Sequence, residues 1–205
     1  MKKLIHLLIL LIFCFNFSSA FCQSTEDLIT ENDWNKMIGY LSKEDWTNAE
    51  KLSLNYIKRY PANNDSIAAP AILRYMYLRC VGAKLGEKQY SKEEALQKVK
   101  NMVGKPIITP PKPYYNECTF NCFQLSEEKN SLYSCSSNQA MTVIQIFENF
   151  FMEDETVIKN VDSLLNKNLR LAGIIKDIKA EGYAMPRLRI EFEKSFIWEA
   201  EKQEE

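Results

Sequence analysis

Histidine, the side chain that most often carries acid–base and metal chemistry, is nearly absent from this sequence. The single histidine, His6, lies in a leader that we expect to be removed from the mature protein. Its loss excludes Ser-His-Asp and Cys-His catalysis, histidine as a general base and zinc sites built on imidazole. The sequence therefore predicts a protein that is not an enzyme, with no catalytic residue, no cofactor and no metal site.

Pairs of carboxylates are the remaining candidates for acid–base chemistry. Glu93 with Glu94 and Glu127 with Glu128 are the clearest pairs. The first pair begins a predicted helix, where acidic residues are expected for structural reasons, and the second lies in a polar turn. A histidine-free enzyme that works with carboxylates is accordingly the least favoured of three functional hypotheses.

Cysteine spacing limits the covalent and metal chemistry that the chain can support. Cys118 and Cys122 are separated by three residues, and only Cys80 and Cys135 accompany them beyond the leader. This spacing and number do not favour a zinc site. On an extended strand the Cα atoms of Cys118 and Cys122 would lie about 13 Å apart, whereas a disulfide requires about 7 Å or less.

A hairpin offers Cys122 a different partner. A polar turn at Ser126–Asn130 would place Cys122 opposite Ser134 or Cys135. A Cys122–Cys135 disulfide would then suit an oxidising compartment. The alternative is that both residues are small buried thiols of the core.

Residues 1–22 have the layout of a secretory signal peptide. Two lysines precede an apolar run over residues 4–17, small side chains follow, and no acidic residue occurs before Glu26. Cleavage is expected after Ala20 or after Cys22. A lipid anchor on Cys22 is the less favoured alternative, because Phe21 is larger than the residue that usually precedes a lipidated cysteine. We therefore expect an exported protein, periplasmic or secreted.

The charge and hydropathy of the chain restrict its partners. The apolar run of the leader is shorter than the ~20 residues of a membrane span, so no integral membrane span is expected. Without Lys2 and Lys3, the chain keeps 24 basic and 27 acidic residues, a net charge of −3. No basic excess points to nucleic acid or to an anionic membrane surface. An unidentified protein is the expected partner.

Residues 24–105 are predicted to form four helices. Apolar residues recur at helical spacing from Trp34 to Leu41 and from Trp46 to Tyr60, and an almost wholly apolar helix follows from about Ile67 to Val81. The last helix begins at a capping box over Ser91–Glu94.

Two short stretches resemble tetratricopeptide repeats. Asp45-Trp46-Thr47-Asn48-Ala49, with Pro61 twelve residues after Ala49, is similar to the second half of a repeat. Ser91–Ala95 with Pro106 is a weaker second copy. The resemblance implies helical hairpins with Ala49 packed where two helices cross. It also implies a protein–protein adaptor with a groove lined by first-helix residues. An unrelated helical bundle is the alternative.

The pattern changes at the proline-rich segment 106–113, which we take as a domain boundary. Residues 106–198 alternate as β-strands do, and residues 199–205 form a charged tail. Three strands, a helix and two strands resemble the OB-fold, a small Greek-key barrel, while a generic small sheet packed on the helices is the alternative. The predicted fold class is α+β, with N-terminal helical hairpins followed by a small β-rich domain.

Together these features predict an exported, non-enzymatic protein–protein interaction or scaffold protein. A ligand-binding, OB-like β-domain that takes an oligosaccharide or a peptide is the second hypothesis, because OB-folds bind extended ligands such as oligosaccharides. Arg187 and Arg189 share one strand face and could form a binding stripe with Lys176. Alternating charge on the solvent side of an edge strand is the commoner explanation of such a pattern.

Overall fold

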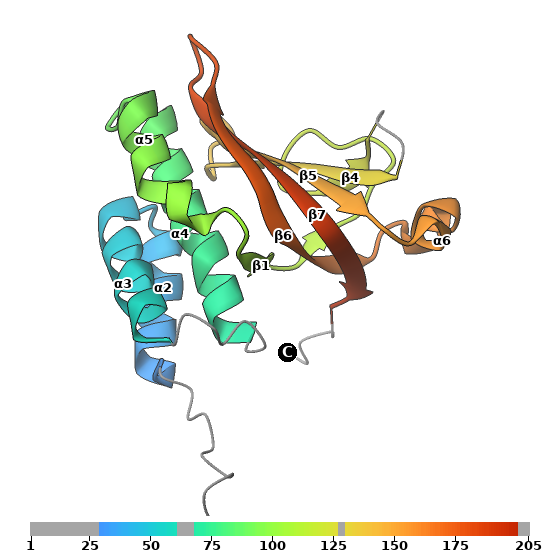
Figure 1. Ribbon diagram of the computed structural model, residues 1–205, viewed down its shortest axis with the longest axis horizontal. Coiled ribbons are helices and arrows are strands. Elements are labelled where there is room, and N and C mark those ends of the chain that lie inside the picture. The colour runs from blue at the N-terminus through green and yellow to red at the C-terminus, as the bar shows by residue number, and fades with distance from the viewer. Residues whose placement is uncertain (1–28, 61–67, 127–129, 201–205) are drawn as a thin grey trace, which may run out of the picture.

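The computed structural model describes residues 29–60, 68–126 and 130–200 (Figure 1). The predicted leader with both cleavage positions and Cys22 lies outside the described residues, as do Pro61, the Glu127–Glu128 pair and the tail beyond residue 200. The described chain is α+β, with four helices followed by a seven-stranded sheet. None of its described helices is both long enough and apolar enough to cross a bilayer.

The helices begin where the sequence provides caps. The hydroxyls of Thr30 and Ser91 accept hydrogen bonds from the backbone N–H groups of Asp33 and Glu94, at 3.2 and 3.1 Å. Glu94 in turn accepts a bond from the Ser91 N–H, which completes the predicted capping box. The helical segments are α2 (Glu31–Ser42), α3 (Trp46–Arg59), α4 (Ala68–Gly86), α5 (Lys92–Val99), η1 (Lys100–Met102), α6 (Glu155–Lys159) and η2 (Val161–Leu164).

Helix α4 packs against both parts of the molecule (Figure 1). Tyr75, Leu78 and Val81 belong to a core shared with the sheet, while other α4 residues join α2 and α3 in a second core. Gly82 allows the close approach of β5, because a Cβ there would collide with the carbonyl oxygen of Gln145. The shared core crosses the predicted boundary between residues 105 and 106. Separate folding of the two parts stays a prediction.

The strands are β1 (Pro106–Ile108), β2 (Lys112–Pro113), β3 (Phe123–Leu125), β4 (Ser131–Ser137), β5 (Ile144–Met152), β6 (Asn168–Glu181) and β7 (Arg187–Glu199). Their order in the sheet is β1-β6-β7-β5-β4-β3, and β2 pairs with β6. β5 and β7 pair in parallel, while the other pairs are antiparallel. β7, the last of the described strands, therefore lies between β5 and β6.

A short connecting segment links the two ends of this strand order. We call residues 109–114 the strap. Its β2 portion pairs with Leu169 and Asn168 of β6, and Tyr114 forms a bridge to Phe123 of β3. The same segment thus contacts β6, which is next to one end of the sheet order, and β3, which is at the other end.

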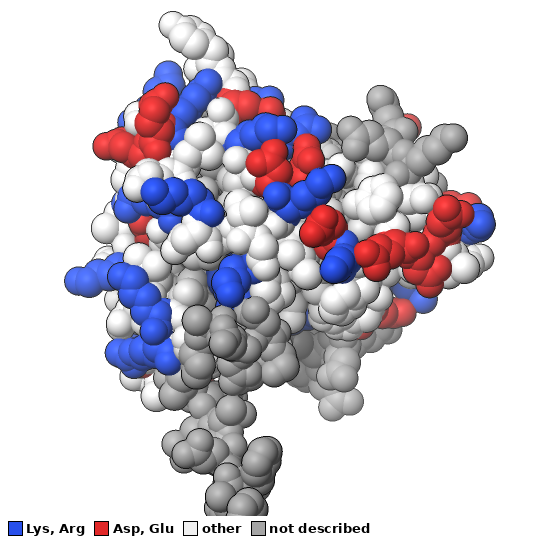
Figure 2. Space-filling model, viewed as in Figure 1, with Lys and Arg blue, Asp and Glu red and all other residues white. Residues whose placement is uncertain are grey.

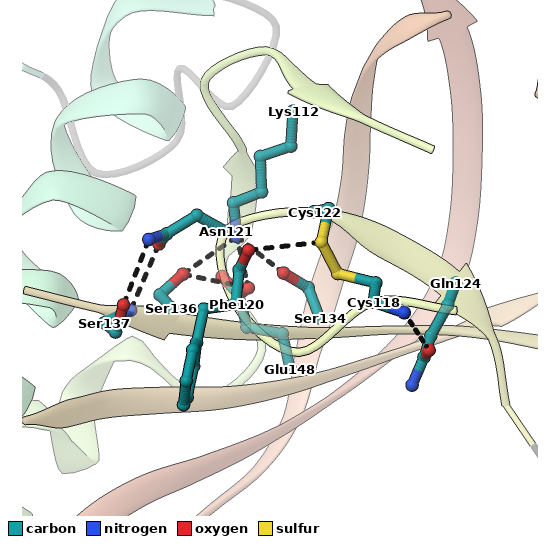
Figure 3. Close-up of a disulfide and its surroundings, with 10 residues drawn as sticks. All are labelled: Lys112, Cys118, Phe120, Asn121, Cys122, Gln124, Ser134, Ser136, Ser137 and Glu148. Carbon is teal, nitrogen blue, oxygen red and sulfur yellow. Dashed lines mark hydrogen bonds and ion pairs between the residues drawn. A yellow bond between two sulfur atoms is a disulfide. The ribbon is translucent and has the colours of Figure 1, made fainter. Parts of the chain in front are cut away.

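The cysteines pair differently from the prediction. The disulfide joins Cys118 to Cys122 (Figure 3), and Cys135 is a free buried thiol, so the expected Cys122–Cys135 bond is wrong. The residues before β3 are not an extended strand. They turn, with Asn121 in the left-handed region at φ 57°, and the Cα atoms of Cys118 and Cys122 are only 6.0 Å apart. Cys80 is the other free, buried cysteine of the described chain.

Candidate binding cleft

A cleft with a volume of about 380 Å³ lies between the helices and the sheet. The end of α2 and the turn after it form one side, and the strap and the end of β4 form the other. Apolar walls with a few polar groups are typical of ligand-binding clefts. The lining residues are Ile38, Leu41, Ser42, Glu44, Trp46, Arg79, Pro110, Pro111, Lys112, Asn121, Ser137 and Gln139.

The apolar wall carries side-chain surface that the fold leaves uncovered. Ile38 is 44% exposed although it is a large aliphatic residue, and Leu41 one turn later is half-buried. Trp46 also lines the cleft, and its indole N–H donates to Glu87 Oε1 at 2.9 Å, which fixes the ring. A ligand that covered Ile38 would gain hydrophobic free energy, which scales with the apolar area removed from water.

Two hydrogen bonds across the rim tie the helical hairpin to the sheet. The side-chain amide of Gln139 donates to Ser42 O at 2.8 Å, and the backbone N–H of Gln139 donates to Glu44 Oε1 at 2.6 Å. Asn138 holds the same loop, since its Oδ1 accepts from the backbone N–H groups of Thr142 and Val143. These contacts fix the width of the cleft at this end.

Arg79 supplies a fixed positive charge to the cleft. Its Nε and Nη2 donate to Gln145 Oε1 at 3.1 and 2.9 Å, and Nη2 also donates to Ser137 O at 3.3 Å. Among the described residues, its Nη1 makes no hydrogen bond that would compete with a ligand. A guanidinium held on one side in this way presents its remaining donors in a fixed geometry suited to a carboxylate.

Lys112 lies at the base of the cleft and reaches into the interior of the sheet (Figure 3). Its ammonium donates to Ser134 Oγ at 2.9 Å, Ser136 Oγ at 2.8 Å and Glu148 Oε2 at 2.5 Å. Ser136 also hydrogen-bonds to the hydroxyl of Tyr75 from α4. The four residues that take part in this network with Lys112 are all buried: Tyr75, Ser134, Ser136 and Glu148. This network anchors the strap, and with it the wall of Pro110 and Pro111.

Burial and charge act in opposition within this ion pair. Burial lowers the pKa of the Lys112 ammonium, and the attraction of Glu148 only partly offsets this effect. Burial raises the pKa of the Glu148 carboxyl, but the charge and the hydrogen bond of Lys112 outweigh it, so the net pKa of Glu148 is lowered. The geometry therefore holds Glu148 as a carboxylate deep in the core.

The lysine and the carboxylate that line the cleft are already occupied by hydrogen bonds. Each N–H of the Lys112 ammonium already has an acceptor, so this amine is not poised as a nucleophile. Glu44 is the one carboxylate among the described lining residues, and it is occupied by the Gln139 N–H. The described residues also contain no cluster of metal-ligating side chains.

The residues considered from sequence as acid–base candidates or as a binding stripe lie outside the cleft. Glu93 and Glu94 are in the first turn of α5, where Glu94 completes the cap. Arg187 and Arg189 lie on β7, and Lys176 lies on β6. The structure does not bring these groups together with the cleft residues.

The residues that build the cleft were missed by sequence reasoning. Lys112 stands between two prolines in a segment interpreted as a linker, and no local rule predicts that it pairs with β6. Glu148 carried a usable signal, because it occupies an inward-facing position between Ile146 and Phe150 on an alternating strand. A charged residue at such a position requires a buried partner.

No protein-family model, no curated protein and no solved structure matches this chain.

Proposed function

We propose that this is an exported, non-enzymatic binding protein that receives an extended segment of a partner protein in the cleft. One observation carries the proposal: the exposed Ile38 and the Arg79 guanidinium face the same cleft, whose walls are fixed from both sides. Export rests on the leader sequence, residues 1–22.

The chemistry of the cleft defines the segment that it would bind. An apolar side chain would cover Ile38 and Leu41 opposite Pro110 and Pro111. A carboxylate or a backbone carbonyl of the same segment would accept a hydrogen bond from Arg79. The apolar wall and the Arg79 guanidinium of the cleft hold fixed positions before binding, which reduces the entropy cost of association.

The helical resemblance supports the same assignment. A tetratricopeptide-like hairpin implies a groove lined by residues of the first helix, and Ile38 and Leu41 belong to α2, the first helix of the hairpin. The burial of Ala49 also supports the hairpin, since this small residue is fully buried in the core between the helices. We retain the tetratricopeptide-like hairpin as part of the proposal.

Photo-crosslinking in the native cells tests the proposal. A benzophenone amino acid would replace Ser42 at the rim, and in a separate strain Lys159 on the distant α6. We expect a protease-sensitive adduct at Ser42 and none at Lys159. Ile38→Asp in the Ser42 strain should abolish the adduct. Leu125→Asp is the matched control, because Leu125 is 43% exposed, close to the 44% of Ile38, but does not line the cleft. This variant should leave the adduct unchanged. An adduct that survives Ile38→Asp would reject the cleft as the site.

A second candidate function is oligosaccharide binding on the other face of the sheet. The rings of Tyr133 and Phe147 lie 5.7 Å apart, and the Arg187 guanidinium lies 4.4 Å from the Phe147 ring centroid. We propose that the strands form an OB-like barrel: β3, β4 and β5 precede α6, β6 and β7 follow it, and the strap contacts both β6 and β3. Titration with chitohexaose should then shift the Tyr133 and Phe147 ring signals, and unchanged spectra would reject this candidate.

A further inference from the structure

The hairpin between β6 and β7 ends in an apolar tip that projects from the molecule. Tyr183 is 98% exposed and Met185 is 58% exposed. Figure 1 shows this turn standing clear of the other strands, and Figure 2 shows an uncharged projection at the same place. Together Tyr183 and Met185 leave adjacent apolar surface in water, which would gain hydrophobic free energy if another molecule covered it.

The support of this tip is rigid. Gly182 adopts φ 78°, and a Cβ at that position would collide with the carbonyl oxygen of Met185, so the turn requires glycine. Arg187 donates to the same carbonyl at 3.2 Å and to Glu181 Oε1 at 3.1 Å. The Arg187 guanidinium also packs on the ring of Phe147 in β5. The turn is thereby fastened to the body of the sheet.

An apolar pocket of about 450 Å³ lies toward the other end of the same hairpin. It is formed by the start of α4, by β1, by residues 172–174 of β6 and by Lys194 and Phe196 of β7. Phe196, which is 59% exposed, and Lys194 stand among its lining residues. Small side chains such as Ala68, Ala71 and Ala172 leave the space open. We call this the β1 pocket.

The tip cannot enter the β1 pocket of its own chain. Gly173 lines the pocket and Gly182 begins the tip, and residues 174–181 of β6 lie between them, so the two glycines are nine positions apart in the chain. At ~3.3 Å per residue the strand holds the two sites roughly 30 Å apart. Contact between them is therefore only available from one copy to another.

We propose that the tip of one copy inserts into the β1 pocket of a second copy. Tyr183 and Met185 supply the apolar surface that the pocket lacks, and Lys194 can meet the tyrosine hydroxyl at the rim. The contact joins two different surfaces, so it is head-to-tail and adds copies in a row or a ring. This self-association is independent of the binding cleft, since no residue that lines the cleft also lines the β1 pocket.

A protein partner suits this tip better than a membrane does. The charges near the hairpin are of mixed sign, because Arg187 pairs with Glu181 and Lys179 pairs with Asp177 (Figure 2). A tip that docks on anionic lipid needs a surplus of basic residues around it. A second copy offers an apolar pocket instead, with no such requirement.

Sedimentation velocity of the mature protein over a range of concentrations tests the proposal. We expect association that increases with concentration. Tyr183→Ser or Phe196→Ser should each raise the concentration of half-association about tenfold or more, as expected for the loss of one buried aromatic side chain. Phe151→Ser is the matched control, since Phe151 is 48% exposed but does not line the pocket. A monomer at all concentrations would overturn the proposal.

Directed disulfide formation separates the proposed contact from other modes of association. Mixing a Tyr183→Cys chain with a Phe196→Cys chain under mild oxidation should give a mixed dimer, while a Tyr183→Cys chain with a Phe151→Cys chain should not. Equal yields from both mixtures would reject the β1 pocket as the receptor. Binding of the monomer to anionic vesicles, lost in Tyr183→Ser, would show that the tip docks on lipid and that the proposal is wrong.

Discussion

Two buried glutamates, one in each part of the molecule, are neutralised in different ways. Glu50 of α3 accepts from Lys84 at 3.0 Å, Lys98 at 2.9 Å and the Tyr90 hydroxyl at 2.7 Å, so both of its oxygens have partners. Glu148 has a single lysine, and its Oε1 has no hydrogen-bond partner among the described residues.

The two sites also differ in their access to water. The Lys98 side chain is 36% exposed, while those of Lys112 and Glu148 are 6% and 0% exposed. An ion pair beside solvent can exchange a lost partner for water, but a fully buried charge cannot. The number of partners and the exposure of an ion pair therefore decide how much free energy of unfolding is lost when one residue of the pair is substituted.

The largest expected effect is the loss of Lys112. Lys112→Met would leave the Glu148 charge uncompensated in the core and lower the free energy of unfolding by about 3–5 kcal/mol. Urea denaturation measures this value. The double variant Lys112→Met with Glu148→Leu should recover most of the loss, because it removes both charges together. A double variant as unstable as the single one would show that packing of the strap, not charge, sets the cost.

An intermediate effect is expected at Glu50. Glu50→Gln keeps the shape of the side chain but removes the charge that holds two lysines, and we expect a loss of about 1–2 kcal/mol at neutral pH. Lys98 retains contact with water in this variant, which limits the cost. A loss as large as that of Lys112→Met would contradict the contrast between the two sites.

Acid titration of stability sharpens the same contrast. Burial raises the pKa of Glu50, but its hydrogen bonds from Lys98, Tyr90 and Lys84 outweigh burial, so the folded pKa is below the ordinary value of 4.5. The contribution of Glu50 to stability is therefore present above about pH 4.5 and is lost as the pH falls through the folded value. Glu50→Gln should show a smaller loss of stability in this range than the unsubstituted protein.

The smallest effect is expected for Lys98→Met. Lys84 and Tyr90 still neutralise Glu50 in this variant, and the methionine keeps the contact with the Tyr90 ring, over which Lys98 Nζ lies at 4.8 Å. We expect a change in the free energy of unfolding within about 1 kcal/mol. Thermal denaturation at two salt concentrations measures this change in stability. A larger loss would show that the exposed lysine is the essential partner of Glu50.

Local rules predicted the helices and several strands well. The capping box at Ser91 and the alternation over Arg187–Phe192 depend on neighbours in sequence, and α5 and β7 begin where these patterns indicate. The hairpin register is also close to the prediction, since Phe123 lies opposite Ser134. These features were accessible because their causes lie within a few residues.

The cleft could not be predicted from the sequence in the same way. Lys112 meets Glu148 across 36 residues of sequence, and Arg79 meets Gln145 across 66. The Cys118–Cys122 bond depends on the left-handed turn at Asn121, which strand periodicity does not reveal. Contacts of this kind follow from strand order, and several strand orders satisfy the same apolar pattern.

The position of β7 has a consequence for the biosynthesis of the protein. β7 is synthesised after the other described strands and lies between β5 and β6, so the described sheet cannot be completed until residue 199 has been synthesised. Long-range pairings of this kind slow folding. A chain that we propose to be exported would benefit, because a secretory channel threads unfolded polypeptide, and the late central strand delays the compact state until translocation is under way.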